Sequence, residues 1–291
     1  MQTGFIGLGN LGLPIAENLS GIHKGLYVYN RTAAKAQPLA DKGAVICTTV
    51  QELAAKCDVV FSIVSDDAAL RHITEGPEGI AAHLKAGGIH ISMSTILPAT
   101  AAALDAVHQQ HGSHYLSCPV MGRPEAARAR KLNIMASGRP EAVNTIKPLL
   151  TDCGAAGIWE YGSDVKAAPL AKLCTNYLIL SSVAAMAEGI HLARQGGIDA
   201  AQWMNMLTQT IFNAPIYNSY GSALLKEAYL PAGFGLKLAL KDVNLVLQQS
   251  AATQGNMPVG KTVQELLQQA VAAGLGDHDV TAVAQIIIKN E

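Results

Sequence analysis

The sequence predicts an α/β protein: a Rossmann-type, doubly wound sheet in the first half, followed by an all-α domain that a long helix joins to it. Three observations predict this fold. A glycine-rich turn follows the first strand, short apolar strands alternate with helical segments as far as residue 159, and the later chain has helical periodicity throughout. We place the boundary so that residues 1–162 form the sheet domain and residues 163–291 the helical domain.

The composition argues against several classes of protein. The chain has 291 residues, a net charge of −1 and a pI near 6.7. Nucleic acids and anionic membranes are bound by basic surfaces, so neither is expected as the main partner. The five cysteines are far apart and odd in number, which is typical of buried thiols in a reducing compartment. A strand begins at once and leaves no room for a signal peptide, so we expect a soluble, cytoplasmic protein.

Residues 7–12 read Gly-Leu-Gly-Asn-Leu-Gly, a GxGxxG motif between a strand predicted at 3–6 and a helix predicted at 14–19. The first glycine allows a tight turn, the second lets the backbone approach a pyrophosphate, and the third lets the helix pack on the strand. A plain strand–helix turn is the alternative. In this context we predict a dinucleotide site, with the pyrophosphate at the helix N-terminus, formed by Gly7, Gly9, Asn10, Leu11 and Gly12.

The second strand, predicted at 26–29, ends in Asn30-Arg31-Thr32. A fold specific for NAD usually has a carboxylate here, to hold the ribose 2′-hydroxyl. A carboxylate would repel a 2′-phosphate, whereas Arg31 would attract it, and Asn30 and Thr32 could donate hydrogen bonds to it. We therefore predict NADP(H) in preference to NAD(H). The alternative is that Arg31 is simply an exposed loop cation.

The remaining elements of the first half alternate. We predict strands at 44–47, 58–64, 88–92, 114–116, 132–136 and 156–159, and helices at 50–55, 66–73, 98–110 and 140–150. Ligands bind beyond the carboxyl ends of parallel strands. The cofactor should therefore be bordered by Val64, Ser65, Ser94 and Thr95.

Three histidines, His108, His111 and His114, are spaced three residues apart near the end of a predicted helix. This spacing could indicate a metal site. However, the strand predicted at His114 breaks the helical spacing, and no carboxylate or thiol accompanies the histidines. We interpret them as solvated residues at a helix end and predict no metal site.

A long apolar helix is predicted from residue 164 to residue 194. It would be roughly 45 Å long, enough to run from one domain into another. Its apolar residues fall on more than one face, and Lys172 and Asn176 lie one turn apart on a shared face. Burying these two groups is costly unless they are used. Alternatively, Lys172 extends to solvent and Asn176 bonds a neighbouring helix. A membrane span is less favoured, because polar residues interrupt the run.

Further helices are predicted at 200–208, 216–225, 236–249, 263–273 and 279–289. A helical domain entered by such an apolar helix would expose a large apolar area if it stayed alone. We therefore expect a homodimer, or a tetramer built from it.

Together, these motifs resemble those of the β-hydroxyacid dehydrogenase family, which includes 3-hydroxyisobutyrate dehydrogenases and glyoxylate/succinic semialdehyde reductases. The resemblance spans nearly the whole chain. GFIGLGNLG followed by NRT is similar to the cofactor signature in its NADP-type form. The other matching segments are Ser94–Pro98, Pro119–Arg123, Gly162–Asn176 and Phe234–Asp242. Ser92 stands where the family commonly has an aspartate.

The resemblance implies roles for individual residues. Lys172 would be the general acid/base, and Asn176 would help to place the substrate. Carbonyl reduction needs a hydride from the nicotinamide and a proton at the developing alkoxide, which a lysine with a pKa lowered by burial can supply. Lys241 would extend toward the nicotinamide end of the cofactor. The implied substrate-binding residues are Thr95, Met121, Gly122, Arg123, Asn176, Phe234 and Asp242.

The substrate loop departs from the family pattern Pro-Val-Ser-Gly-Gly. Met121 replaces the serine and cannot donate a hydrogen bond, while Arg123 replaces the second glycine and could serve as a charged anchor or point to solvent. The PVMGRP sequence resembles imine reductases, but these generally lack a lysine at the position of Lys172. The expected function is therefore an NADP(H)-dependent oxidoreductase interconverting a small aldehyde or keto acid and its hydroxy acid. The alternatives are an imine reductase-like enzyme and a non-catalytic NADPH-binding sensor.

Overall fold

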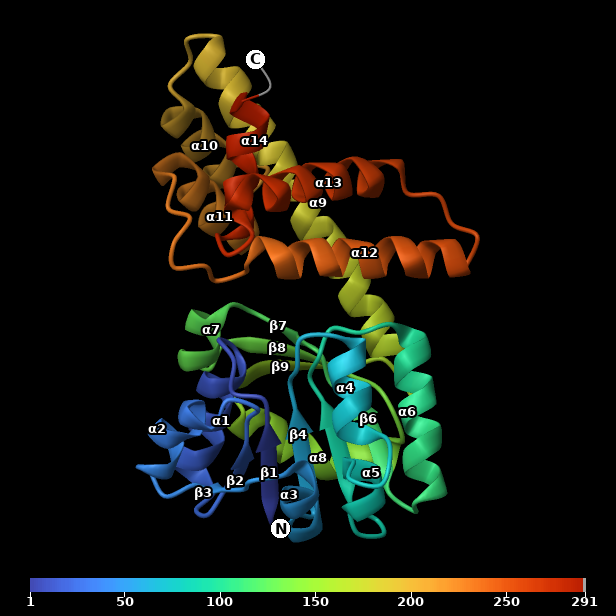
Figure 1. Ribbon diagram of the computed structural model, residues 1–291. Coiled ribbons are helices and arrows are strands. Elements are labelled where there is room, and N and C mark those ends of the chain that lie inside the picture. Colours follow the sequence, from blue (N-terminus) through green and yellow to red (C-terminus); the bar gives the residue numbers. More distant parts are fainter. Residues whose placement is uncertain (290–291) are drawn as a thin grey trace. The chain divides into compact units, whose positions relative to one another are not determined.

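The computed structural model describes residues 1–289 and contains two compact units. The first spans Met1–Lys172 and is α/β, whereas the described part of the second begins at Leu173 and is all-α (Figure 1). The predicted fold class is confirmed. The division between the units falls inside helix α9 (Ala167–Gln195), later in the chain than the boundary expected at 162/163.

The first unit contains a six-stranded sheet in the order β3-β2-β1-β4-β5-β6, and every neighbouring pair is parallel. Its strands are β1 (Thr3–Ile6), β2 (Tyr27–Tyr29), β3 (Val45–Ile46), β4 (Val59–Ser62), β5 (Ile89–Ser92) and β6 (His114–Ser117). The chain runs outward from β1 to β3 and then returns to place β4 on the other side of β1. This reversal is a topological switch point, where ligands bind beyond the carboxyl ends of the strands.

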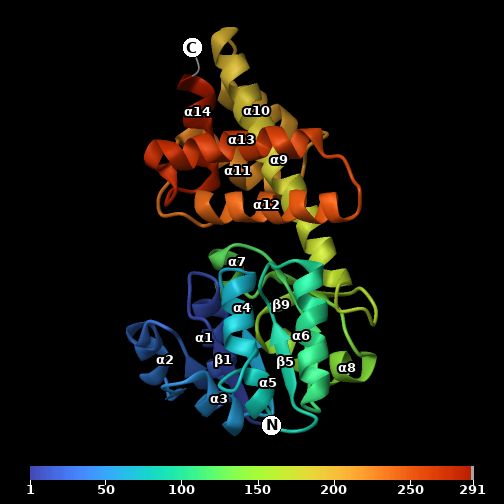
Figure 2. The same ribbon diagram turned by 45° about the vertical axis from the view of Figure 1, so that its right-hand side comes forward.

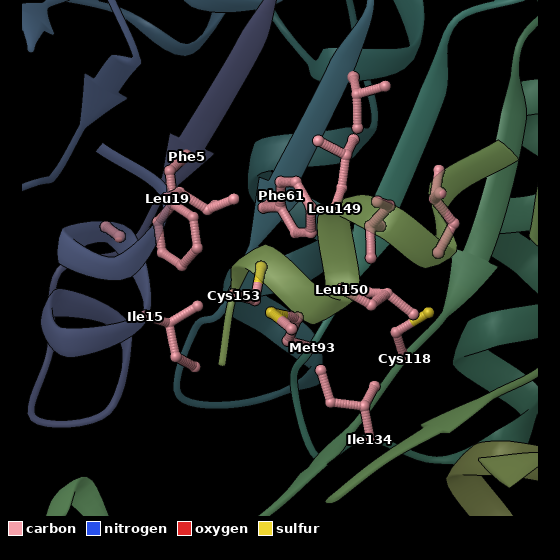
Figure 3. Close-up of a cluster of buried hydrophobic side chains, with 14 of the residues drawn as sticks. Phe5, Ile15, Leu19, Phe61, Met93, Cys118, Ile134, Leu149, Leu150 and Cys153 are labelled. Carbon is pink, nitrogen blue, oxygen red and sulfur yellow. The ribbon is translucent and has the colours of Figure 1, made fainter. Parts of the chain in front are cut away.

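Alternate residues of each strand face opposite layers of helices. Phe5 and Phe61 pack in one hydrophobic cluster with α1 (Gly12–Ile22) and α8 (Pro140–Asp152), as Figure 3 shows. Their neighbours Ile6 and Val60 pack in another cluster on the opposite face. That face is covered by α3 (Val50–Lys56), α4 (Asp67–Thr74), α5 (Ile80–His83) and α6 (Pro98–Gln110), of which α4, α5 and α6 lie in front of the strands in Figure 2. Burial on both faces explains the nearly continuous apolar strands.

A second, three-stranded sheet completes the first unit. The pair β7 (Val120–Met121) and β8 (Leu132–Ala136) is antiparallel, whereas β8 and β9 (Ala155–Glu160) are parallel. Between β7 and β8 lies the short helix α7 (Pro124–Arg128). The predicted strands at 132–136 and 156–159 therefore exist, but they form a sheet of their own. Neither β7 nor α7 was expected, because elements of two and five residues are too short to show a period.

The second unit consists of the later part of α9 and the helices that follow it. These are α10 (Ala200–Gln209), α11 (Pro215–Lys226), α12 (Leu236–Ala252), α13 (Pro258–Ala270) and α14 (Ala284–Lys289), with a π-turn at Val271–Leu275 and a 3₁₀ turn at Val280–Val283. Asp199 caps α10 by accepting from the backbone N–H of Ala201 at 2.8 Å. The final predicted helix begins later than expected, because residues 280–283 form the 3₁₀ turn instead.

Helix α9 contributes Leu180, Val183, Met186 and Ile190 to the core of the second unit. By length and composition it could also cross a membrane, and it is the one helix among residues 1–289 that passes that test. A buried core helix of a soluble protein passes the same test, and the packing of these side chains identifies α9 as such a helix.

Candidate functional site

The glycine turn after β1 has the geometry of a dinucleotide cradle. Gly7 has a φ of +99°, and a Cβ there would lie 2.1 Å from the carbonyl oxygen of Ile63. A Cβ at Gly12 would lie 2.0 Å from the carbonyl oxygen of Gly7, whereas a Cβ at Gly9 would meet nothing within 4 Å. The first and third glycines are thus required by the fold itself. The second borders open space, where a pyrophosphate can approach the backbone.

The N-terminus of α1 adds a second feature suited to a phosphate. Leu11 is the N-cap, no side chain of the described residues caps the helix, and its first turn contains no acidic residue. Its leading N–H groups and the positive end of the helix dipole therefore favour an anion. The exposed residues Gly9 and Asn10 lie just before this helix end. The turn and the helix end fit the diphosphate of a pyridine nucleotide.

Asn30 at the end of β2 ties the glycine turn in place. Its Oδ1 accepts from the backbone N–H of Leu8 at 2.8 Å, and its Nδ2 donates to the carbonyl of Thr32 at 2.9 Å. An aspartate could accept the first bond but could not donate the second. Asn30 therefore has a structural role that the sequence analysis did not anticipate. The next two residues, Arg31 and Thr32, are exposed beside it.

The loops after β4 and β5 are linked by side chains. Ser94 Oγ accepts from the backbone N–H of Val64 at 2.9 Å, and Asp67 Oδ1 accepts from the backbone N–H of Leu97 at 3.0 Å. Ser65 is exposed and Thr95 is partly buried. These bonds hold the two predicted cofactor-bordering segments together at one edge of the sheet.

Lys172, also in the first unit, is 9% exposed, and its Nζ donates to Sδ of Met121 at 3.2 Å. Met121 is the last residue of β7, and the predicted substrate loop continues with Gly122 and partly buried Arg123. The arrangement joins the two residues that the sequence singles out most strongly: an isolated lysine in an apolar helix and a methionine in place of the family's serine.

Ser137, a residue that the sequence analysis missed, anchors the start of α9. Its Oγ accepts from the N–H of Ala168 at 3.1 Å and donates to the carbonyl of Val165 at 3.2 Å. Ser137 is fully buried just after β8. It thereby fixes the first turn of the helix on which Lys172 lies, one further turn along.

In the second unit, Asp242 joins two other predicted residues. Its Oδ2 accepts from Nδ2 of Asn176 at 2.6 Å, and its Oδ1 forms an ion pair with Nζ of Lys241 at 2.8 Å. Asn176 is 3% and Asp242 4% exposed, so this carboxylate is removed from water and needs both partners. The contact explains the polar residue in the apolar surface of α9: Asn176 bonds α12 through a charged acceptor.

Partly buried Phe234 lies in the loop before α12, and a second buried carboxylate holds that loop. Asp279 Oδ2 accepts from the backbone N–H groups of Gly233 at 3.0 Å and Phe234 at 3.1 Å. Asp279 is 1% exposed and also caps the 3₁₀ turn through the N–H of Thr281. Asp279 was not predicted; an Asp before a helical segment indicates a cap but not a partner 45 residues away.

The interpretation of the histidines was wrong for His108. It is fully buried and lies in a chain of hydrogen bonds: its Nε2 is 3.0 Å from Nδ1 of His90, and its Nδ1 is 2.8 Å from Oγ of Ser113. His90 Nε2 in turn lies 2.8 Å from Oγ of Ser62. Burial lowers the pKa of His108 to about 3 and lowers that of His90. His108 lies on the side of α6 that packs against the sheet. Its spacing from the other two histidines gave no indication of this.

Of the other histidines, His111 is exposed, as expected, and His114 is partly buried. Within residues 1–289, no group of three or more histidine, cysteine, aspartate or glutamate side chains is arranged to hold a metal ion.

Four of the five cysteines are buried and free, whereas Cys174 on α9 is exposed and free.

The predicted residues therefore fall into two sets. The first unit holds the glycine turn, the segments after β2, β4 and β5, and the Lys172–Met121 pair; the second holds Asn176, Lys241, Asp242 and Phe234. Two family models match this chain. The NAD binding domain of 6-phosphogluconate dehydrogenase matches residues 2–163, and the NAD-binding domain of NADP-dependent 3-hydroxyisobutyrate dehydrogenase matches residues 167–287.

The chain belongs to the β-hydroxyacid dehydrogenase family. It is 34% identical to the uncharacterized oxidoreductase YfjR of Bacillus subtilis, over 99% of this chain and 100% of that protein. It is 28% identical to the chloroplastic glyoxylate/succinic semialdehyde reductase 2 of Arabidopsis thaliana, over 99% of this chain and 79% of that protein. A solved structure of Psf3 in complex with NADP+ and 2-OPP has a TM-score of 0.88 and 26% identity, covering 98% and 99% of the two chains.

The family resemblance inferred from the motifs is thus confirmed. This β-hydroxyacid dehydrogenase is an oxidoreductase of the 3-hydroxyacid type with a pyridine nucleotide-binding domain. The open space beside Gly9, the N-terminus of α1, which no described side chain caps, and the tight turn at Gly7 are the parts of the chain that fit such a cofactor.

Proposed function

We propose that this β-hydroxyacid dehydrogenase is an NADPH-preferring reductase that interconverts a small aldehyde or keto acid and its hydroxy acid, with Lys172 as the general acid/base. The observation that carries the proposal is the Lys172 amine, buried to 9% exposure and directed at Met121 of the substrate loop. A buried lysine amine that lies beside the substrate loop is within reach of a group bound there, and an amine is a suitable proton donor and acceptor for a carbonyl oxygen.

The nicotinamide supplies the hydride when the cofactor is bound. Lys172 donates a proton to the oxygen of the carbonyl as negative charge develops there, and accepts it back in the oxidative direction. Asn176 hydrogen-bonds the substrate, and Asp242 orients Asn176 by holding its Nδ2 at 2.6 Å. Within the first unit, Thr95 and Gly122 contribute further contacts to the substrate. In the second unit, the family resemblance gives Phe234, whose backbone Asp279 holds, a substrate-binding role of its own.

The segment after β2 supports the preference for NADP(H). Arg31 and Thr32 are exposed there, and Asn30 presents a neutral amide that is fixed by the N–H of Leu8. A guanidinium beside a hydroxyl suits a 2′-phosphate, and a neutral residue avoids the repulsion that an aspartate would cause. The Psf3 structure with NADP+ is consistent with this preference.

Absorbance of NADPH with three substrates tests the reaction. The purified protein is offered glyoxylate, succinic semialdehyde and a cyclic imine at saturating NADPH. Turnover of at least one of the two aldehyde acids, glyoxylate and succinic semialdehyde, is expected. Both appear in the name of the related Arabidopsis thaliana reductase. Turnover of the imine alone would replace the proposal with an imine reductase, which the methionine at position 121 favours. NADPH binding without turnover of any substrate would indicate a sensor.

Copies of the chain associate, we further infer, through α9. Leu178, Ala185 and Leu192 are exposed at intervals of seven residues and so form an apolar line along this helix. Leu178 is 62% and Leu192 73% exposed. A homodimer, or a tetramer built from it, would cover this line. A molar mass in solution near the single-chain value of 30.4 kDa would contradict the inference.

The net charge of the chain is −1, so we propose no nucleic acid or membrane as a partner. The proposed partners are small molecules and a second copy of the chain, in the cytoplasm.

A further inference from the structure

The thioether of Met121 lies beside the Lys172 amine, on a strand whose backbone is paired. Val120 pairs with Ile134 and Met121 with Asn133, so the backbone is held in the β7–β8 ladder. The next residue, Gly122, has a φ of +143°, and a Cβ there would lie 2.6 Å from Cδ2 of Leu132. The glycine conformation and the ladder set where the backbone of Met121 runs, and Sδ of Met121 lies 3.2 Å from Nζ of Lys172.

The chemistry of this position differs from that of a serine. A thioether has no donor and is only a weak acceptor, and the rest of the methionine side chain is apolar and adaptable. A carboxylate is stabilised by N–H and O–H donors. A substrate group beside both residues thus meets the Lys172 amine, which is already needed at the reacting oxygen, and a thioether that offers no donor where the family's serine would offer one.

We propose that Met121 is a specificity-determining residue, which selects carbonyl substrates whose substituent next to the reacting carbon is alkyl. Any carboxylate is then separated from that carbon by methylene groups instead of being attached to it. This proposal rests on the function proposed above for Lys172 and names the substrate class: ω-aldehyde acids and aliphatic aldehydes in preference to α-keto acids and glyoxylate.

The test compares substrates that differ in the place of the carboxylate. Initial rates with NADPH give kcat/KM for glyoxylate, succinic semialdehyde and butanal, in the wild type, Met121→Ser and Met121→Leu. For the wild type, succinic semialdehyde and butanal should exceed glyoxylate by at least about tenfold. Met121→Ser restores a donor, so the preference should shift toward glyoxylate by about tenfold or more, the usual effect of one hydrogen bond to a charged group. Met121→Leu keeps the apolar surface and should keep the wild-type preference.

A binding measurement accompanies the rates. Oxamate, a non-reacting analogue of an α-keto acid, is titrated into the enzyme–NADPH complex while the fluorescence of NADPH is followed. Its dissociation constant should fall about tenfold in Met121→Ser and stay unchanged in Met121→Leu. The proposal is overturned if Met121→Ser leaves the preference and the oxamate affinity unchanged, or if Met121→Leu shifts them as much as the serine does. Loss of catalysis by Lys172→Ala is independent of both results, so the specificity proposal can fail while the proposed reaction stands.

Discussion

The side-chain nitrogen of Asn176 lies 2.6 Å from Oδ2 of Asp242, and both residues are almost completely buried. The second oxygen of the same carboxylate pairs with Lys241 at 2.8 Å. A buried charge is stable only when it is paired and hydrogen-bonded, so these three residues depend on one another. Asp242 is therefore a positioning residue for Asn176 and Lys241, in addition to the substrate contact that the family resemblance implies.

Replacing Asp242 should destabilise the protein. Asp242→Asn removes the charge that holds Lys241 and weakens the bond from Asn176, so the free energy of unfolding should fall by about 1.5–3 kcal/mol, the range for hydrogen bonds to charged groups. Urea unfolding measures the change. The control is Asp277→Asn, whose side chain is 88% exposed in an ion pair with Lys237 and should contribute under about 1 kcal/mol. If the two substitutions lowered the free energy of unfolding equally, the contacts of Asp242 with Asn176 and Lys241 would not stabilise the fold as proposed.

Two alanine substitutions in the glycine turn should affect different properties: one should weaken cofactor binding and the other should lower the stability of the fold. A Cβ at Gly9 meets nothing within 4 Å, so Gly9→Ala should leave thermal unfolding of the free protein nearly unchanged while weakening NADPH binding at least about tenfold. A Cβ at Gly12 lies 2.0 Å from the carbonyl oxygen of Gly7, so Gly12→Ala should lower the melting temperature itself. If Gly9→Ala bound NADPH as the wild type does, the diphosphate would not lie at this turn.

Arg31 should determine the choice of cofactor. Arg31→Ala removes a guanidinium from the proposed 2′-phosphate site, so the KM for NADPH should rise about tenfold or more while that for NADH changes little. Lys35→Ala, an exposed cation four residues further along, is the matched control and should change both values only slightly. Equal increases for the two cofactors in Arg31→Ala would contradict the preference for NADP(H).

The buried histidines should make stability depend on pH. Burial lowers the pKa of His108 to about 3, whereas in the unfolded chain it lies near 6.5. Between these values the unfolded state binds more protons, so the stability contributed by neutral His108 is present above pH 6.5 and is lost as the pH falls toward 3. From pH 7.5 to pH 5 the loss should be about 2 kcal/mol for this residue.

Urea unfolding at these two pH values tests the histidine prediction. His108→Gln removes the titration, so the variant should lose about 2 kcal/mol less than the wild type over the same interval. His111→Gln changes an exposed residue and should keep the wild-type dependence. A pH dependence in His108→Gln that matches that of the wild type would contradict the prediction.

Much of the fold could be predicted because its signals are local. The strands at 3–6 and 132–136 and the helix at 98–110 have the predicted bounds, since strand length, glycine turns and Pro98 mark them directly. The separate sheet formed by β7, β8 and β9 could not be predicted, because strand pairing is not encoded in the alternation of elements. The same limit applies to His108, whose burial depends on how α6 packs against β5 and β6.

The candidate site was predictable as a list of residues but not as a set of contacts. The helical spacing and polarity of Lys172 and Asn176 mark both residues in the sequence. Their partners, Met121 and Asp242, lie 51 and 66 residues away, and only the folded chain brings them within bonding distance. Asn30 illustrates the reverse case: the sequence indicates a cofactor role, while the structure adds a hydrogen bond from the backbone N–H of Leu8, which an aspartate could also accept.

The turnover number of Lys172→Ala tests the central claim most directly. With the best aldehyde substrate and saturating NADPH, kcat should fall at least about a hundredfold, the usual contribution of one general acid/base. The dissociation constant of NADPH, followed by its fluorescence, should stay near the wild-type value, and Lys166→Ala, an exposed lysine of the preceding segment, should retain full activity. A Lys172→Ala enzyme that turned over within a few-fold of the wild type would contradict the account.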